Sequence, residues 1–309
     1  MRATANQKQT DGIRPNGNPG TSPGGPAYEL PMLVNFTTTD VSGEVGYATK
    51  AAQYSVNLAW SRFRAADDFM TWRNPAIVTG LTNEQTTIAP DNNQWKLGLN
   101  AVWKQLPMGS TLALRGTYSR LSNDVTIPTT AITVVGTAGN LVNTNPSDAN
   151  FRGLNIYKTV SAALNSHLTK QLDSKLYFNW WEKDNESTHV VFTPVRAVGG
   201  AVAQSCDVNW TTGATSATCS NELFHYRKWN AGVDLQFRVN PQNRVAGGWD
   251  YADTKRERID YDRSKDNKVY IELKNTSLDT VTAKVKYQHM RRRSDFLFGD
   301  LNPLAAAPA

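Results

Sequence analysis

After residue 37 the chain alternates apolar and polar residues over ten segments. The stretch YSVNLAW at 54–60 is typical, since every second residue from Tyr54 to Trp60 is apolar. A period of two predicts β-strands that present one apolar and one polar face. The ten predicted strands lie at 38–48, 54–60, 95–103, 111–118, 154–168, 174–181, 229–239, 244–251, 268–274 and 280–288.

The connections between these strands alternate between short and long. Short turns are predicted at 49–52, 106–110, 169–173, 240–243 and 275–279, and long polar loops at 64–93, 122–152, 182–224 and 256–267. Short turns at one end and long loops at the other are typical of outer-membrane barrels, with the turns in the periplasm and the loops outside the cell. The sequence therefore predicts an all-β fold, a transmembrane antiparallel up-and-down β-barrel.

This pattern divides the chain into three regions. Residues 1–36 are predicted to be a polar, Gly/Pro-rich extracellular loop or N-terminal segment. Residues 37–293 are predicted to form the barrel strands with their turns and loops, and residues 294–309 a C-terminal tail.

Aromatic residues gather at the loop ends of the apolar faces. An amphipathic ring suits the boundary between hydrocarbon and water, so this position predicts a girdle at one membrane interface. Seven residues form the predicted girdle: Trp60, Trp95, Tyr118, Trp180, Trp229, Tyr251 and Tyr287. Tyr47, Tyr54 and Trp103 suggest a sparser girdle at the turn side. The alternative is the core of a soluble β-sandwich, but core aromatics should scatter along a strand rather than collect at one end.

The opposite faces carry charges of both signs, which a strand tolerates where that face sees water or polar protein. The candidate lumen-facing residues are Lys96, Lys104, Arg115, Asp234, Arg238, Lys284 and Lys286. A plain water-filled lumen and a lumen lined to receive another protein are both compatible with this mixture. Lys158 falls on the apolar face and Val102 on the polar face, so we expect a local bulge or a register shift near either of them.

The amino-acid composition excludes several classes of function. Only 39% of the 309 residues are hydrophobic, and no stretch approaches the roughly 18–20 apolar residues of a membrane helix. The net charge is +6, but Lys and Arg are spread along the chain without a basic cluster among aromatics, so we expect no nucleic-acid partner. The four histidines lie far apart and no phosphate-binding loop is present, so we expect no enzymatic activity.

Two cysteines, Cys206 and Cys219, are separated by twelve residues. This spacing fits no zinc motif and neither residue begins a haem-attachment sequence. A local disulfide in an oxidising compartment is favoured over two free thiols, and closing so short a loop would stabilise it by roughly 3 kcal/mol.

Several segments resemble one family in their order along the chain. GIRPNG at 12–17, YELPMLVNFTTTDVSGEVGY at 28–47, SRFRAADDFMTWRNP at 61–75 and IAPDNNQWKLGLNAVW at 88–103 are similar to the MtrB/PioB family of outer-membrane barrels associated with decahaem cytochromes. The resemblance is most specific over 12–124 and continues more loosely to RRRSDFLFGD at 291–300.

The resemblance implies a place in the bacterial outer membrane and a role in extracellular electron transfer. In that family the barrel is a sheath around a multihaem c-type cytochrome that enters its lumen from the periplasmic side, and a further cytochrome can dock at the long outer loops. The haem belongs to the partner, so we expect no cofactor of the chain's own. The alternative function is a passive diffusion porin for small solutes.

The chain also departs from the family. The family's barrels have more than twenty strands, whereas about ten are predicted here, and the family's Cys-containing N-terminal segment is absent. We therefore expect these strands to be part of a larger barrel, either as a fragment or as a truncated member, or else to form a divergent small relative. The direction of electron flow and the terminal donor or acceptor leave no trace in the sequence.

Overall fold

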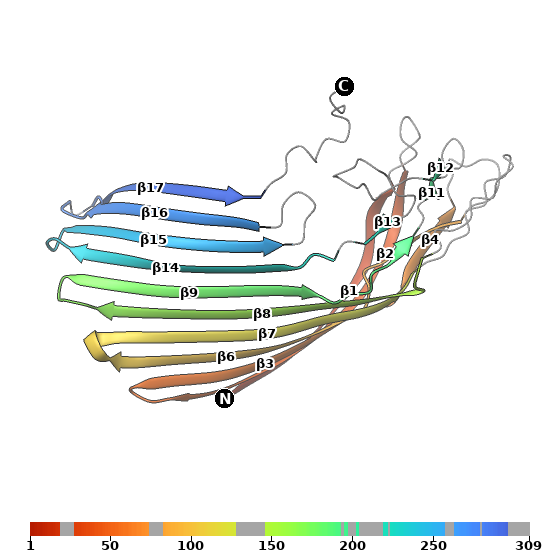
Figure 1. Cartoon of the computed structure of the whole chain (residues 1–309). Helices are drawn as coiled ribbons and strands as arrows, with labels where there is room; N and C mark the ends of the chain where they lie inside the picture. The colour runs from red at the N-terminus through yellow and green to blue at the C-terminus, as the bar shows by residue number, and fades with distance from the viewer. Residues whose placement is uncertain are drawn as a thin grey trace, which may run out of the picture.

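The computed structural model describes residues 1–18, 28–73, 83–127, 146–192, 195–196, 202–203, 219–221, 223–256, 263–278 and 280–295. Its main feature is one antiparallel sheet of eleven strands that follow one another in chain order (Figure 1). The strands are β1 (Arg2–Asn18), β2 (Tyr28–Ala48), β3 (Ala52–Ala65), β6 (Asn92–Leu106), β7 (Ser110–Thr126), β8 (Asn150–His167), β9 (Leu172–Asn185), β14 (Tyr226–Arg238), β15 (Asn243–Arg256), β16 (Arg263–Asn275) and β17 (Ala283–Ser294). The predicted all-β, up-and-down architecture is confirmed.

Three small two-stranded sheets lie within the predicted long loops. β4 (Phe69–Arg73) pairs with β5 (Asn83–Thr87), β10 (Val191–Phe192) with β13 (Cys219–Ser220), and β11 (Val195–Arg196) with β12 (Val202–Ala203). Figure 1 shows β4, β12 and β13 at one end of the curved sheet and the tight hairpin turns at the other. Long and short connections therefore lie at opposite ends, as the sequence predicts.

The loop predicted for residues 1–36 is wrong for most of its length. Residues 2–18 form β1, and β2 begins at Tyr28, ten residues before the predicted strand. β1 lacks alternating apolar residues, so its side chains give no strand signal. Its backbone instead pairs with β2 over the whole strand, from Arg2 opposite Glu44 to Asn18 opposite Tyr28. This strand raises the number in the main sheet from ten to eleven.

The other strands also run further than their apolar faces. β9, for example, extends to Asn185, although its alternation ends at Trp181. The cause is backbone pairing with a neighbouring strand, which can continue where a side chain has no apolar partner. Of the predicted tail 294–309, Ser294 ends β17, and residues 296–309 lie outside the described part of the chain.

The distribution of exposed residues is inside out relative to a soluble protein. Among the described residues, the only large hydrophobic side chains that are buried are Met32, Ile88 and Val190. The apolar face of the sheet is open instead: Leu58 is 56% exposed and Ile271 52%. On β3, the residues of the polar face are more covered than those of the apolar face. A soluble sandwich would bury the apolar face against a second sheet, so that alternative is wrong.

The turn between β6 and β7 interrupts the regular ladder. The register shifts between Trp103 and Leu106, and a short 3-10 turn, η1 (Pro107–Gly109), follows. Gln105 and Met108 take left-handed backbone conformations with φ of 59° and 60°. The irregularity expected near Val102 therefore lies just beyond it. Val102 itself pairs with Gln53 in regular register.

Strands β1 and β17 form the two edges of the sheet. Within the described ranges each pairs with one neighbour, β1 with β2 and β17 with β16. No helix among the described residues is long and apolar enough to cross a membrane.

Candidate functional site

The seven predicted girdle residues occupy one face of the sheet. Trp60 lies opposite Trp95, and Trp180 lies opposite Trp229. Tyr118, Tyr251 and Tyr287 lie opposite Leu97, Ala231 and Ile271, which belong to the same apolar face. The register thus brings all seven to the exposed face. Five lie within about five residues of the loop end of their strand, whereas Tyr118 lies at the middle of β7 and Tyr287 lies nearer the turn end of β17.

Ring contacts join neighbouring members of the girdle. The ring centroids of Trp95 and Tyr118 are 5.1 Å apart, and those of Trp229 and Tyr251 are 5.3 Å apart. At the turn side, Tyr54 meets Trp103 edge-on at 5.8 Å. Aromatic pairs at these distances add stability beyond their buried area.

Residues that lie opposite one another on successive strands form a row across the sheet. From β3 to β15 the girdle residues step from row to row toward the turn end of the sheet. Trp60 and Trp95 share one row, and Tyr118 lies one row nearer the turns. Trp180 and Trp229 share the row after that, and Tyr251 lies one row further still. Strands that tilt in a barrel shift their register in this way, so a line that steps across rows can stay level with a membrane plane.

The polar face is organised by two tyrosines that each reach across a glycine to an aspartate. Tyr177 lies opposite Gly232, which lies opposite Asp250, and the Tyr177 hydroxyl donates to Asp250 Oδ2 at 2.8 Å. Asn230 Nδ2 donates to the same oxygen at 2.9 Å. A side chain on Gly232 would collide with the tyrosine, because an added Cβ would lie 2.4 Å from its hydroxyl oxygen.

A second row repeats this arrangement in the opposite direction. Tyr270 lies opposite Gly248, which lies opposite Asp234, and the Tyr270 hydroxyl donates to Asp234 Oδ1 at 2.7 Å. Lys286 Nζ stands 4.3 Å from the centre of the Tyr270 ring. We name these two rows the Tyr-Gly-Asp rows. They give both carboxylates on the polar face a phenol hydroxyl donor, and Asp250 also pairs with Lys268 Nζ at 3.7 Å.

The candidate lumen residues all lie on the polar face, but in different settings. Lys284 Nζ pairs with Glu272 at 3.0 Å, and Arg238 pairs with Asp173 at 2.9 Å. Lys96, Lys104 and Arg115 make no ion pair with any other described residue. Arg115 lines a hollow of about 580 Å³ over β6–β9 and β14, together with Lys175, Tyr177 and Asp234.

The sequence reasoning left out Tyr177, Asp250 and Tyr270. The alternation alone places these residues on the polar face, since Tyr177, for example, lies between the apolar-face residues Leu176 and Phe178. A tyrosine on a polar face gives no separate signal, however. Its aspartate partner is 73 residues away for Tyr177 and 36 for Tyr270.

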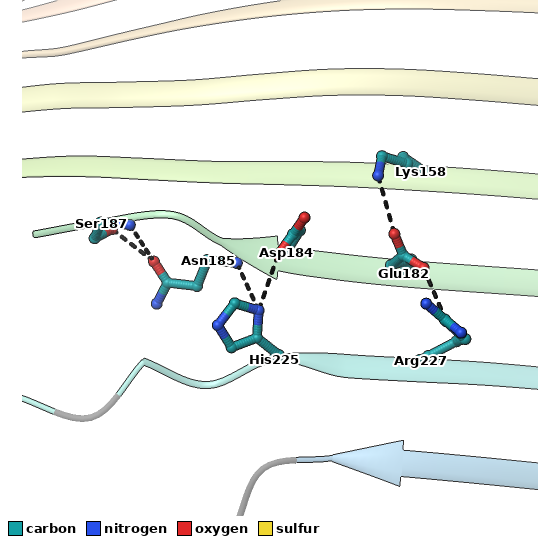
Figure 2. Close-up of polar contacts among 7 residues, drawn as sticks. All are labelled: Lys158, Glu182, Asp184, Asn185, Ser187, His225 and Arg227. Atoms are coloured by element: carbon teal, nitrogen blue, oxygen red, sulfur yellow. Dashed lines mark hydrogen bonds and ion pairs between the residues drawn. The ribbon is translucent and has the colours of Figure 1, made fainter. Parts of the chain in front are cut away.

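Just beyond the girdle, charged residues replace the apolar ones on the exposed face. Lys158 on β8 and Arg227 on β14 both pair with Glu182 on β9, at 3.0 and 2.9 Å (Figure 2). Lys158 lies in regular register there, so its place on the apolar face is real and no bulge is involved. The hydrogen bond from Lys158, followed by that from Arg227, lowers the pKa of Glu182. Figure 2 also shows Asp184 turned toward His225, 2.9 Å from its Nδ1.

Asp253 and Arg263 form a two-bond ion pair beyond Tyr251. Arg263 donates to the two carboxylate oxygens of Asp253 at 3.1 and 2.6 Å, and Asp253 is only 5% exposed. The hydrogen bonds from Arg263 are the main cause of the lowered pKa of Asp253.

This ion pair predicts a pH dependence. Because the pKa of Asp253 is lower in the folded sheet than in the unfolded chain, its contribution to stability is complete above about pH 4 and is lost as the pH falls through the folded value. We expect Asp253→Asn to lower the unfolding temperature at pH 7 and to have less effect at pH 3. Thermal unfolding in detergent at the two pH values measures this, and an equal loss at both would contradict it.

The predicted disulfide cannot be placed. Cys206 lies outside the described residues, and of Cys219 only the backbone, in β13, is described.

Comparison with known families identifies the family of the chain. A family model described as "Putative outer membrane beta-barrel porin, MtrB/PioB" matches residues 2–302, nearly the whole chain. The comparison with curated proteins finds no match.

Two solved structures are similar to the sheet at a low level. The ferric-catecholate import receptor Fiu from E. coli K12, in its closed form, is 14% identical with a TM-score of 0.43, and the match covers 84% of this chain and 41% of that chain. The toluene transporter TodX from Pseudomonas putida is 9% identical with a TM-score of 0.32, covering 94% and 72%. The chain thus spans about two fifths of the length of Fiu, and scores this low carry no argument about function.

Proposed function

The chain belongs to the MtrB/PioB family of outer-membrane β-barrel porins, and on this basis we propose that it forms part of the wall of a sheath. The sheath houses a multihaem c-type cytochrome and positions it for electron transfer across the outer membrane. Outer-membrane barrels of this kind are not a class of enzyme. In the proposed role the chain carries no haem of its own and acts by holding its partner in place.

The observation that carries this proposal is the contrast between the two faces of the sheet. The exposed apolar face suits lipid, where backbone groups must be paired within the sheet, and the nine strands between the edges β1 and β17 pair on both sides. The opposite face is polar and ordered, since the Tyr-Gly-Asp rows tie Asp234 and Asp250 to phenol hydroxyls. A wall with satisfied carboxylates can lie against a protein without leaving buried charges unpaired.

The free cations on that wall suggest how a partner is held. Lys96 and Arg115 make no ion pair with another described residue, and they lie on neighbouring strands β6 and β7. Basic groups that line a cavity attract an acidic surface and orient it during docking. We propose that they meet carboxylates on the cytochrome. The long loops beyond the girdle would then be the place for a further, extracellular cytochrome.

The first test is the haem content of the purified barrel. The complete reading frame would be expressed in its host, and the protein would be purified from detergent-solubilised outer membranes. The amount of c-type haem, from its absorbance, would then be compared with the amount of barrel protein. We expect stoichiometric haem. The chain has no C-x-x-C-H sequence, so this haem would belong to a bound cytochrome.

A matched pair of variants separates contact from general charge loss. The inner four are Lys96, Lys104, Arg115 and Lys274. The outer four, on the exposed face, are Lys255, Lys265, Arg291 and Arg293. Replacing the inner four by glutamine should weaken cytochrome binding by about tenfold, since each removes one attractive charge, whereas the same change at the outer four should leave it unaltered. Equal losses would argue against a lumen contact.

The alternative of a passive diffusion porin is supported by the family's description as a porin. A porin would be free of haem and would conduct ions when reconstituted alone in a planar bilayer. A sheath purified with its cytochrome should conduct little until the cytochrome is removed. Haem-free protein from the native host that forms open channels would overturn the sheath proposal.

A further inference from the structure

A surface of basic residues lies on the exposed face immediately beyond the aromatic girdle. We define the outer basic belt as seven basic side chains of this face, on β8 and from β14 to β17, that lie on the loop side of the girdle. Its seven members are Lys158, Arg227, Lys255, Arg263, Lys265, Arg291 and Arg293. Three acidic residues on the strands share the surface: Glu182, Asp184 and Asp253.

The cross-strand register brings these residues into direct contact range of one another. Lys158, Glu182, Arg227, Lys255 and Arg263 lie opposite one another on five successive strands. In the next row toward the turns, Lys265 lies opposite Arg293. Residues in such pairs have Cβ atoms about 5 Å apart, and like charges directly opposite each other destabilise a sheet.

The acids of the surface are already engaged. Glu182 holds Lys158 and Arg227, Asp253 holds Arg263, and Asp184 contacts His225 (Figure 2). The outer four, in contrast, form no ion pair within the described part of the chain, and Lys255, Arg291 and Arg293 are exposed. The belt therefore retains an excess of positive charge that an external anion can offset.

The position of the belt identifies the anion. Each member lies on the same face as the lipid-facing residues, between the level of the girdle, where Lys158 lies opposite Tyr118, and six residues beyond it, at the end of the sheet that carries the long loops. In an outer-membrane barrel that end faces outward, so the belt lies at the depth of the lipid headgroups of the outer leaflet. Long basic side chains reach that depth with their stems along the apolar surface.

We propose that the outer basic belt binds the phosphate groups of phosphorylated glycolipids in the outer leaflet, of which lipid A is the common form. Arginine and lysine are the usual ligands of phosphate, and arginine can bind it through two parallel hydrogen bonds. Glu182 and Asp253 act as positioning residues, because each orients basic side chains toward the headgroup layer. The belt would bind lipid around the barrel whether or not a cytochrome occupies the lumen.

The test uses the full chain purified from outer membranes in a neutral detergent. It is titrated with lipid A, with chemically dephosphorylated lipid A and with inorganic phosphate, and binding is followed by isothermal titration calorimetry. We expect lipid A to bind at least about tenfold more tightly than the dephosphorylated form, since several basic residues act together. Inorganic phosphate alone should not compete at millimolar concentration, because it lacks the acyl chains that lie along the apolar face.

Two variants locate the site. Replacing the outer four by glutamine should lower the affinity for lipid A at least about tenfold. The same change at the inner four should alter the affinity less than about twofold, which is the usual effect of a distant surface change. Exchanging lysine for arginine and the reverse at the outer four keeps the charge and should retain binding. Heat-modified migration in gel electrophoresis verifies that each variant is folded.

Several outcomes would overturn the proposal. Equal binding of lipid A and its dephosphorylated form by the wild-type protein would show that the acyl chains alone are bound. Equal losses from the inner and outer replacements would show a general effect of net charge. Competition by inorganic phosphate would show a site for the free anion rather than for the leaflet. The first and third of these use the unaltered protein, so they decide the matter even where a variant does not fold.

Discussion

Leu235→Arg is expected to destabilise the membrane-inserted sheet by about 2–4 kcal/mol, the cost of placing arginine on the lipid face near the bilayer midplane. Leu235 is 42% exposed on the apolar face of β14. It lies six residues from Trp229, about 20 Å along a strand. At a tilt of about 40° this distance is about 15 Å along the membrane normal, close to the middle of the hydrocarbon layer.

The neighbouring Gln236 is the matched control. It lies on the same strand at nearly the same depth, but its side chain belongs to the polar face, opposite Asp173 and Ala246. Gln236→Arg is therefore expected to change stability by less than about 0.5 kcal/mol. Both variants would be unfolded with urea in lipid vesicles and compared with the wild type. If the two substitutions lowered the free energy of unfolding equally, the assignment of the apolar face to lipid would be wrong.

The second large effect is expected from Gly248→Ala. A Cβ at this position would lie 2.5 Å from both Asp234 Oδ1 and Tyr270 Cε1, and 2.8 Å from the backbone oxygen of Val233. The tyrosine could swing away, but the backbone oxygen cannot move without distorting β14. The methyl group would therefore break the Tyr270–Asp234 hydrogen bond and strain the ladder, at a cost of about 1–3 kcal/mol.

Gly247, the preceding residue, tests the same change without the clash. It lies on the apolar face, where an added Cβ would meet only the Tyr270 backbone oxygen at an ordinary 3.5 Å. Gly247→Ala should be neutral or stabilising by up to about 1 kcal/mol, because alanine restricts the unfolded chain. Urea unfolding of the two variants under identical conditions gives the comparison. A loss at Gly247 as large as that at Gly248 would contradict the role of the Tyr-Gly-Asp row.

These two glycines show the limit of reading a strand from its sequence. The alternation in β15 assigns Gly247 to the apolar face and Gly248 to the polar one, and the structure agrees. It does not say what lies above each glycine. That depends on Tyr270 and Asp234, which come from two different neighbouring strands and meet over Gly248 only when both registers are set.

The N-terminal segment shows a different limit. Residues 2–18 contain too few apolar residues to alternate, so a pattern of side chains predicts a loop, although the backbone forms a strand along β2. Pattern reasoning detects a strand by what its side chains bury. It cannot detect one that is held chiefly by backbone hydrogen bonds to a neighbour, and the eleventh strand was missed for that reason.

The resemblance of several segments indicated the family, and the local alternation in the sequence determined most strands, the face of each residue within them and the ends that carry loops or turns. All of these depend on neighbours close in the chain, since successive side chains of a strand point to opposite sides. Only the tertiary structure decided the register between strands, and with it the stepwise descent of the girdle, the Tyr-Gly-Asp rows and the outer basic belt. Register joins residues such as Tyr177 and Asp250 that are distant in the chain, and no local periodicity records which residue faces which.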